Sequence, residues 1–180
     1  MTDPPSDQQP LARQPYRVCF ICSGNICRSP TGEIVLRAML QEAGLGDAVA
    51  VDSAGTGHWN VGEAVHGPAL KALRRHGYDG SAHVARQVSA SWLGERDLIL
   101  AADKGHVREL RHLVATDQHD RIRLLREFDP AAAQAGTLEV DDPYYGRRED
   151  FERAFAEIER ACRGLVGHLR AHVAAQGTPG

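Results

Sequence analysis

The stretch Val18-Cys-Phe-Ile-Cys-Ser-Gly-Asn-Ile-Cys-Arg-Ser-Pro30 decides how this chain folds. Its first four residues form a continuous apolar run, which is typical of a strand buried on both faces of a parallel sheet. Ser29 followed by Pro30 predicts a helix start, with the serine hydroxyl as N-cap and proline at the first helical position. The residues between them therefore form a loop from a buried strand to a helix N-terminus. The helix is expected to bury Ile34, Val35, Ala38 and Met39 and to end at Gly44.

The alternation of strand and helix continues along the chain. Short apolar runs predict further strands at 49–51, 98–101 and 122–125. Helices are expected at 69–76, closed by Gly77, and at 105–113. A long amphipathic C-terminal helix is predicted by the spacing of Phe151, Phe155, Ile158, Cys162, Leu165 and Leu169. The predicted fold class is therefore α/β, with an open, doubly wound four-stranded parallel sheet flanked by helices and an anion-binding loop after the first strand.

Length and composition indicate one globular domain. The chain has 180 residues, of which 42% are hydrophobic and 25% charged. We expect a disordered proline-rich arm at 1–15, one folded domain at 16–175 and a flexible tail at 176–180. No apolar run approaches the roughly 18 residues of a membrane-spanning helix, so we expect no membrane association.

Charge and cysteine usage restrict the partners and the compartment. The net charge of -3 gives no broad electrostatic reason to bind nucleic acid. Three of the four cysteines lie within residues 19–27, whereas a secreted disulfide framework would spread them along the chain. The N-terminus lacks the basic start and apolar stretch of a signal peptide. We therefore expect a cytoplasmic protein, although export without a signal peptide stays open.

The loop from Cys22 to Arg28 has the chemistry of a phosphate-binding nucleophile site. Unpaired N–H groups at a helix N-terminus attract anions, and this environment together with a nearby arginine favours the thiolate form of a cysteine. Arg28 can hold two phosphate oxygens at once, and Ser29 is placed to donate a hydrogen bond to the thiolate. The alternative is that Cys22 is only a small buried hydrophobe.

The segment Asp141-Asp-Pro-Tyr-Tyr-Gly146 supplies a candidate proton donor. Cleavage of a phosphoester with a poor leaving group needs an acid, because expulsion of an unprotonated alkoxide or phenolate is slow. Taken alone, however, the segment is better explained as a turn, since Asp-Pro commonly initiates turns.

Together these two segments, Cys22-x-Gly-Asn-Ile-Cys-Arg-Ser-Pro30 and Asp142-Pro-Tyr-Tyr-Gly146, resemble the two signature loops of bacterial low-molecular-weight protein tyrosine phosphatases. Residues 52–56 and 83–87 also resemble family segments in order and spacing. The resemblance spans about Tyr16 to Leu169, so the domain at 16–175 is identified as a phosphatase domain.

The resemblance implies a reaction and a set of partners. Cys22 attacks phosphorus to form a phosphocysteine, while Arg28 and the loop amides stabilise the transition state. Asp142 protonates the leaving oxygen and then acts as a base toward water. The implied function is hydrolysis of phosphotyrosine and small aryl phosphates, with a phosphotyrosine protein as substrate, a tyrosine kinase as a possible partner, and no metal or cofactor.

The resemblance also assigns supporting residues. Ser53 and His83 support a strained backbone conformation at Asn25, and Ile26 occupies a position where the related protein-arginine phosphatases usually carry threonine, which favours phosphotyrosine. Trp59, Tyr144 and Tyr145 border the substrate cleft. The phosphate-binding loop comprises Ser23, Gly24, Asn25, Ile26, Cys27 and Ser29.

The second cysteine of the loop implies redox regulation. In the family the cysteine matching Cys27 can form a disulfide with an oxidised nucleophile, so we expect reversible inactivation by peroxide. Cys19 and Cys162 are expected to be packing residues. Gly32 stands where alanine is common, and we expect this difference to affect stability more than chemistry.

Three other functions are weighed against a phosphatase. Arsenate reductases share the fold and the nucleophile loop but use further cysteines in mid-chain, and none lies between Cys27 and Cys162. A non-catalytic module that binds phosphate or phosphotyrosine would not need the nucleophile, arginine and acid that are all present. A thiol redox protein is the third alternative.

Overall fold

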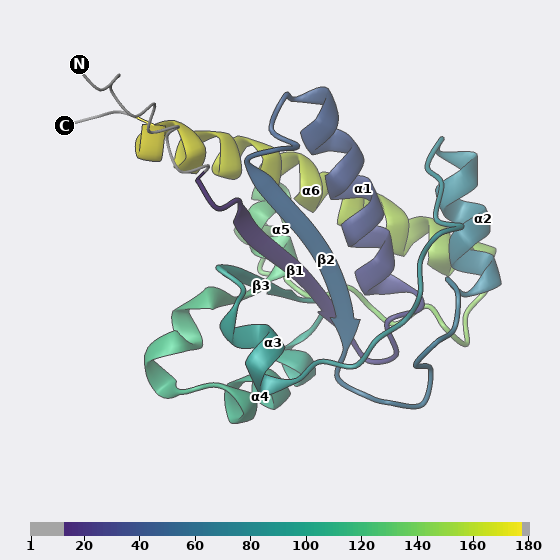
Figure 1. Ribbon diagram of the computed structural model, residues 1–180. Helices are drawn as coiled ribbons and strands as arrows, with labels where there is room; N and C mark the ends of the chain where they lie inside the picture. Colours follow the sequence, from purple (N-terminus) through teal and green to yellow (C-terminus); the bar gives the residue numbers. More distant parts are fainter. Residues whose placement is uncertain (1–12, 178–180) are drawn as a thin grey trace, which may run out of the picture.

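One parallel sheet of four strands forms the centre of the computed structural model, which describes residues 13–177 (Figure 1). The strands are β1 (Tyr16–Cys22), β2 (Val49–Gly55), β3 (Leu98–Ala101) and β4 (Ile122–Leu124). Their order is β2-β1-β3-β4, and each neighbouring pair is parallel. The predicted fold class is confirmed.

Helices connect the strands. They are α1 (Arg28–Glu42), α2 (Gly67–Arg75), α3 (Ala90–Gly94), α4 (Lys104–Leu113), α5 (Pro130–Ala135) and α6 (Arg148–Gly177), with 3-10 turns at Thr116–Arg121 and Leu125–Phe128. The predicted α1, α2, α4 and α6 are confirmed. The sequence did not predict α3 and α5, because five and six residues are too few to display a helical periodicity.

The two faces of the sheet pack against different helices, as Figure 1 illustrates. Successive side chains of a strand point to opposite faces. Val18 and Phe20 of β1 belong to the larger core cluster, which includes residues of α1, α2 and α6. Cys19 and Ile21 belong to the smaller cluster, together with residues of α3 and α4. This alternation explains why β1 is apolar from Val18 to Cys22.

The C-terminal helix α6 closes the larger face. All six residues of its predicted apolar stripe are buried, and Cys162 and Cys19 are both fully buried packing residues as expected. The sulfur of Cys162 lies 3.8 Å from the carbonyl oxygen of Gly32. A Cβ at Gly32 would collide with the ring of Phe20, so the glycine allows α1 to lie close to the sheet.

The predicted start of α1 was wrong. The helix begins at Arg28 with Cys27 at the N-cap position, so Ser29 lies inside its first turn. The Ser29 hydroxyl faces the preceding loop instead of capping the helix.

The predicted stripe of α1 was also displaced. The apolar side chains that α1 buries fully are Val35, Leu36 and Leu40, whereas Ile34, Ala38 and Met39 are partly buried. Most of the helix is buried because it packs against both β2 and α6, and a helix covered on two sides has no single narrow stripe.

The ends of the described chain differ in part from the predicted arm and tail. Residues 13–15 have no regular secondary structure, and the rest of the predicted arm lies outside the described residues. Helix α6 continues through Gln176 and Gly177, which were assigned to the tail, while 178–180 lie outside the described residues. No helix between residues 13 and 177 is both long and apolar enough to span a bilayer.

Candidate active site

The loop between β1 and α1 is fixed to the end of β2. Cys22 is the last residue of β1 and pairs with Gly55 in β2. The N–H of Thr56 donates to the carbonyl of Cys22 at 2.9 Å. A Cβ at Gly55 would lie 2.6 Å from the carbonyl oxygen of Ser23, so only glycine allows the loop to pass this close. The loop backbone therefore has little freedom at its start.

Asn25 holds the middle of the loop. It is the only non-glycine residue between 13 and 177 with a positive φ, at 56°. Its side-chain amide donates to Ser29 Oγ at 2.8 Å and to Ser53 Oγ at 2.9 Å, and its Oδ1 accepts from the N–H of Arg86 at 2.9 Å. Its carbonyl accepts a 2.7 Å hydrogen bond from His83 Nε2. The structure thus brings Ser53 and His83 to Asn25, as the resemblance implied.

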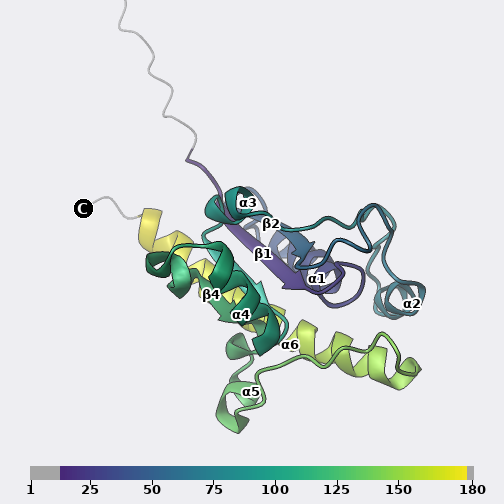
Figure 2. The same ribbon diagram turned by 90° about the horizontal axis from the view of Figure 1, so that it is seen from below.

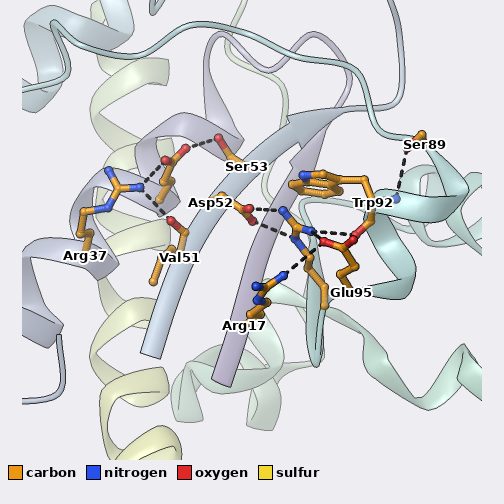
Figure 3. A network of polar contacts seen from close by, with 10 residues as sticks. Arg17, Arg37, Val51, Asp52, Ser53, Ser89, Trp92 and Glu95 are labelled. Carbon is orange, nitrogen blue, oxygen red and sulfur yellow. Dashed lines mark hydrogen bonds and ion pairs between the residues drawn. The ribbon is translucent and has the colours of Figure 1, made fainter. Parts of the chain in front are cut away.

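Both residues that support Asn25 contact the carboxylate of Glu33, which sequence reasoning missed. The Ser53 hydroxyl donates to Glu33 of α1, and Arg37 contacts Glu33 and also donates to the carbonyl of Val51 at 2.8 Å. Figure 3 shows Arg37, Val51 and Ser53 in this network, beside the ion pair of Asp52. Glu33 is buried and its side chain also lies 3.8 Å from His83. One carboxylate therefore connects both supports of the loop to α1.

The nucleophile candidate has a hydroxyl partner. Cys22 Sγ lies 2.9 Å from Ser29 Oγ, and both residues are buried. Ser29 Oγ already accepts a hydrogen bond from Asn25, so its own proton is free to point at the sulfur. Such a donor stabilises a thiolate more than a thiol.

Arg28 is held in place by a residue that the sequence analysis did not identify. Its Nη1 donates to Asp103 Oδ2 and to the carbonyl of Val140, both at 2.8 Å. Its Nη2 lies 3.7 Å from Asp142 Oδ2. Asp103 follows the carboxyl end of β3, and that position was the available signal, because ligands bind at this edge of open α/β sheets.

A histidine, also missed, contacts the loop from α4. His106 Nε2 lies 2.9 Å from Ser23 Oγ, and the residue is 2% exposed. Its Nδ1 is 3.1 Å from Asp103 Oδ1 but lies outside hydrogen-bond geometry. Burial lowers the pKa of His106, although the Asp103 carboxylate opposes this shift. Burial alone would raise the pKa of Asp103, but His106 and Arg28 hold it below its usual range.

The loop from Cys22 to Arg28 forms one side of a cleft of about 350 Å³. Trp59 and Tyr145 are 63% and 97% exposed and form its rim. The side chain of Asp142 is 52% exposed and accepts a 3.2 Å hydrogen bond from the N–H of Tyr144. The lining residues are Cys22, Ser23, Gly24, Ile26, Cys27, Arg28, Trp59, Asn60, Asp142, Tyr144 and Tyr145.

The Asp-Pro segment forms the turn that its sequence predicts. The N–H of Gly146 donates to the carbonyl of Pro143 at 2.7 Å, which makes a turn. That turn directs Asp142 into the cleft, whereas Asp141 does not line it. The turn therefore brings a carboxyl group to the cleft.

The other cysteines differ in their surroundings. Cys27 lines the cleft, and burial, together with the nearby Cys22, raises the pKa of its thiol. Cys19 and Cys22 have the Cys-x-x-Cys spacing of thiol oxidoreductases. They lie three positions apart in one strand, so their side chains point to opposite faces. Cys19 is fully buried and therefore cannot act in such a pair.

Within the described part of the chain, no group of side chains has the arrangement of a metal centre. Among residues 13–177, no group of three or more histidine, cysteine or acidic side chains could hold a metal ion.

Comparison with known proteins identifies relatives with the same fold. The family model described as "Low molecular weight phosphotyrosine protein phosphatase" matches residues 17–175. A low molecular weight protein-tyrosine-phosphatase of Streptomyces coelicolor is 49% identical over 159 residues, which cover 88% of this chain and 96% of the relative. Low molecular weight protein-tyrosine phosphatase A of Mycobacterium tuberculosis is 48% identical over 153 residues, which cover 84% of this chain and 90% of the relative.

Solved structures agree with these relatives. A protein tyrosine phosphatase from Entamoeba histolytica, solved with Hepes in the active site, superposes with a TM-score of 0.82 at 30% identity and covers 87% of this chain and 98% of its own. YfkJ from Bacillus subtilis also has a TM-score of 0.82, at 31% identity, and covers 89% of this chain and 98% of its own.

Proposed function

The chain belongs to the low molecular weight phosphotyrosine protein phosphatase family, and we propose that Cys22, Arg28 and Asp142 carry out its reaction. The protein is a protein-tyrosine phosphatase, which places it among the phosphoric monoester hydrolases. The observation that supports this residue assignment is that a thiol, a guanidinium and a carboxyl group line one cleft of about 350 Å³.

In the first step the Cys22 thiolate attacks phosphorus. A sulfur–phosphorus bond forms while the bond from phosphorus to the tyrosine oxygen breaks. The Ser29 hydroxyl and the N-terminus of α1 stabilise the thiolate, and Arg28 binds the oxygens of the phosphoryl group. Because Asp103 and Val140 hold one arm of the guanidinium, its orientation is fixed before the substrate arrives.

Asp142 acts as acid and then as base. Its carboxyl proton moves to the leaving phenolate oxygen, which makes tyrosine a better leaving group. Its carboxylate then takes a proton from the water that attacks the phosphocysteine, so that inorganic phosphate leaves and the thiolate returns. The contact of 3.7 Å between Asp142 and Arg28 supports this role, since the acid lies beside the group that binds the phosphate.

The walls of the cleft support an aryl phosphate as substrate. Trp59 and the pair Tyr144–Tyr145 border the opening, where aromatic side chains can pack against a phosphotyrosine ring. Ile26 adds an apolar side chain to the loop, which favours phosphotyrosine over phosphoarginine. The substrates are phosphotyrosine proteins, and we infer a tyrosine kinase as functional partner and the cytoplasm as location.

Cys27 is the second thiol of the same cleft, and we infer that it protects the nucleophile. Peroxide oxidises the Cys22 thiolate to a sulfenic acid, and the Cys27 thiol then displaces water from that sulfur to form a disulfide. A cellular dithiol reduces the disulfide and restores both thiols.

Hydrolysis of para-nitrophenyl phosphate tests the proposed function. The wild type and Cys22→Ser are assayed between about pH 4 and 9 with a chelator present, a range that spans the titration of carboxyl and thiol groups. We expect turnover by the wild type without metal and none by Cys22→Ser. An inactive or metal-dependent wild type would instead favour a phosphate-binding module on the same fold.

A further inference from the structure

A second concave surface, which we call the basic pocket, lies between α2 and the start of α6. Figure 2 shows these two elements at the same end of the molecule. The pocket encloses about 370 Å³. Its charged lining residues are Lys71, Arg75, Arg147 and Arg148, and Phe151 forms an apolar wall. No acidic residue lines it, so the pocket is positively charged.

Acidic residues of α6 balance part of this charge: Glu152 pairs with Arg75, and the N–H and the charge of Arg147 help to lower the pKa of Asp150. Arg75 forms an ion pair with Glu152, but the side chains of Lys71, Arg147 and Arg148 make no hydrogen bond or ion pair with any residue in 13–177. These three side chains are exposed and can therefore reach a ligand.

The two acidic residues that interact with the cations of the pocket also have partners elsewhere. Asp150 accepts hydrogen bonds from the N–H of Arg147 and from the side chain of Arg153. Glu152 also contacts His76. Glu149 belongs to the same turn of α6 but does not line the basic pocket. The first turn of α6 adds the partial positive charge of a helix N-terminus, which further favours an anion.

The basic pocket lies next to the catalytic cleft. Tyr144 lines the cleft, and Gly146, two positions later, lines the basic pocket. His66 stacks on Tyr144 with ring centroids 4.7 Å apart and lies 5.8 Å from the ring of Phe151. A single layer of rings therefore separates the two sites. Since the two Cα–Cα steps from Tyr144 to Gly146 span at most about 7.6 Å, the linings of the two sites adjoin, and a few residues of an extended peptide can connect them.

We propose that the basic pocket binds acidic side chains of the phosphoprotein substrate, a few residues from the phosphotyrosine. This proposal rests on the proposed function of the cleft. Separate carboxylates on neighbouring residues suit cations that are spread over α2 and the start of α6, and the Phe151 ring can pack against the methylene groups of a glutamate. Positive charge at this place also steers an acidic segment toward the cleft.

Three phosphotyrosine peptides test the proposal. One carries three glutamates before the phosphotyrosine, one carries them after it, and the third has glutamines at both places. We expect the wild type to hydrolyse one acidic peptide with a kcat/KM about three- to tenfold above that of the glutamine peptide. High salt should remove the preference, because exposed charges are screened.

Two double variants show where the preference arises. The variant Arg147→Gln/Arg148→Gln should lose the preference for an acidic peptide over the glutamine peptide. The control Arg108→Gln/Arg111→Gln removes the same charge from exposed residues of α4, which line a different surface, and should keep it. Equal turnover of all three peptides by the wild type, or equal loss of preference in both variants, would overturn the proposal.

A small substrate separates this proposal from the function of the cleft. All three proteins should hydrolyse para-nitrophenyl phosphate equally, since this compound cannot reach the basic pocket. If the wild type fails to hydrolyse it, the proposed function is wrong. Fluorescence anisotropy of the labelled peptides then decides about the basic pocket: tighter binding of an acidic peptide that depends on Arg147 and Arg148 supports it, and equal binding of all peptides refutes it.

Discussion

Arg28 donates a hydrogen bond to Asp103 across 2.8 Å, and this contact joins the loop after β1 to the N-cap of α4. The guanidinium is 4% exposed, so its charge is buried and needs a partner. Asp103 therefore pairs with Arg28 and also caps α4, because its other oxygen accepts from the N–H of His106 at 3.1 Å.

The variant Asp103→Asn separates the ion pair with Arg28 from the capping of α4. Asparagine is as good an N-cap as aspartate, so α4 should keep its start. The guanidinium loses its anionic partner and should point less uniformly at the phosphate, so we expect kcat/KM for para-nitrophenyl phosphate to fall about tenfold or more. Steady-state kinetics together with circular dichroism check both parts. Unchanged kinetics would show that Val140 alone orients Arg28.

Asp142→Asn should slow substrates according to their leaving groups. Phenyl phosphate should lose about a hundredfold or more in kcat/KM, which reports the first step, because its phenolate needs protonation, whereas an ester of a strongly acidic phenol should lose much less. Asp141→Asn is the matched control, since its side chain does not line the cleft, and it should behave like the wild type. An equal loss for both kinds of ester would argue against a general acid at Asp142.

Two substitutions at Asn25 distinguish backbone strain from hydrogen bonding. Asn25→Ala removes three side-chain hydrogen bonds and keeps the left-handed backbone, so the free energy of unfolding should fall by about 2–4 kcal/mol. Asn25→Gly removes the same hydrogen bonds, but glycine tolerates the left-handed backbone. Its free energy of unfolding should therefore be about 1 kcal/mol higher than that of Asn25→Ala. Urea denaturation measures both values. Identical stabilities would mean that the positive φ costs nothing here.

His106 makes stability depend on pH in a defined direction. Burial lowers its pKa in the folded protein below the unfolded value of about 6.5. Below pH 6.5 the unfolded chain therefore binds more protons, so stability is complete above that pH and declines as the pH falls toward the lower, folded pKa. His168 changes the pH dependence of stability in the same direction, because burial lowers its pKa too.

The free energy of unfolding of His106→Asn should therefore fall less than that of the wild type between about pH 7.5 and 5.5. The exposed His58→Asn is the control and should keep the full decline. Urea titrations at both pH values supply the comparison. A decline of wild-type size in His106→Asn would exclude His106 as its source.

Cys27→Ser tests protection of the nucleophile. After exposure to peroxide, the wild type should regain most of its activity with a dithiol, whereas the variant should regain little, because its sulfenic acid oxidises further to an irreversible sulfinic acid. Mass spectrometry should find a disulfide between Cys22 and Cys27 only in the wild type. Equal recovery of the two proteins would refute the protective role.

The sequence predicted the elements whose signals are local. Most of β1 is a continuous apolar run from Val18, and the Cys22–Arg28 loop has its candidate nucleophile and arginine within one short segment. Asp103, His106 and Glu33 act through contacts with residues far away in the chain, which no periodicity reveals. Ser29 was wrongly predicted as the N-cap of α1 because its hydroxyl also takes part in tertiary contacts.

At Ser29 two interactions compete. A serine before a proline is a good N-cap in isolation, but here Asn25 and Cys22 both contact the hydroxyl. The tertiary contacts therefore decide its role, and the helix begins two residues earlier than predicted, at Arg28 and not at Pro30.

The bond from Arg28 to the carbonyl of Val140 joins residues 112 positions apart. During synthesis on the ribosome, the loop that carries Cys22 emerges before Val140 and Asp142. A nascent chain that has not yet exposed Val140 therefore displays the Cys22 thiol before the carbonyl that orients Arg28 is available. We expect such a nascent chain to lack phosphatase activity toward proteins near the ribosome.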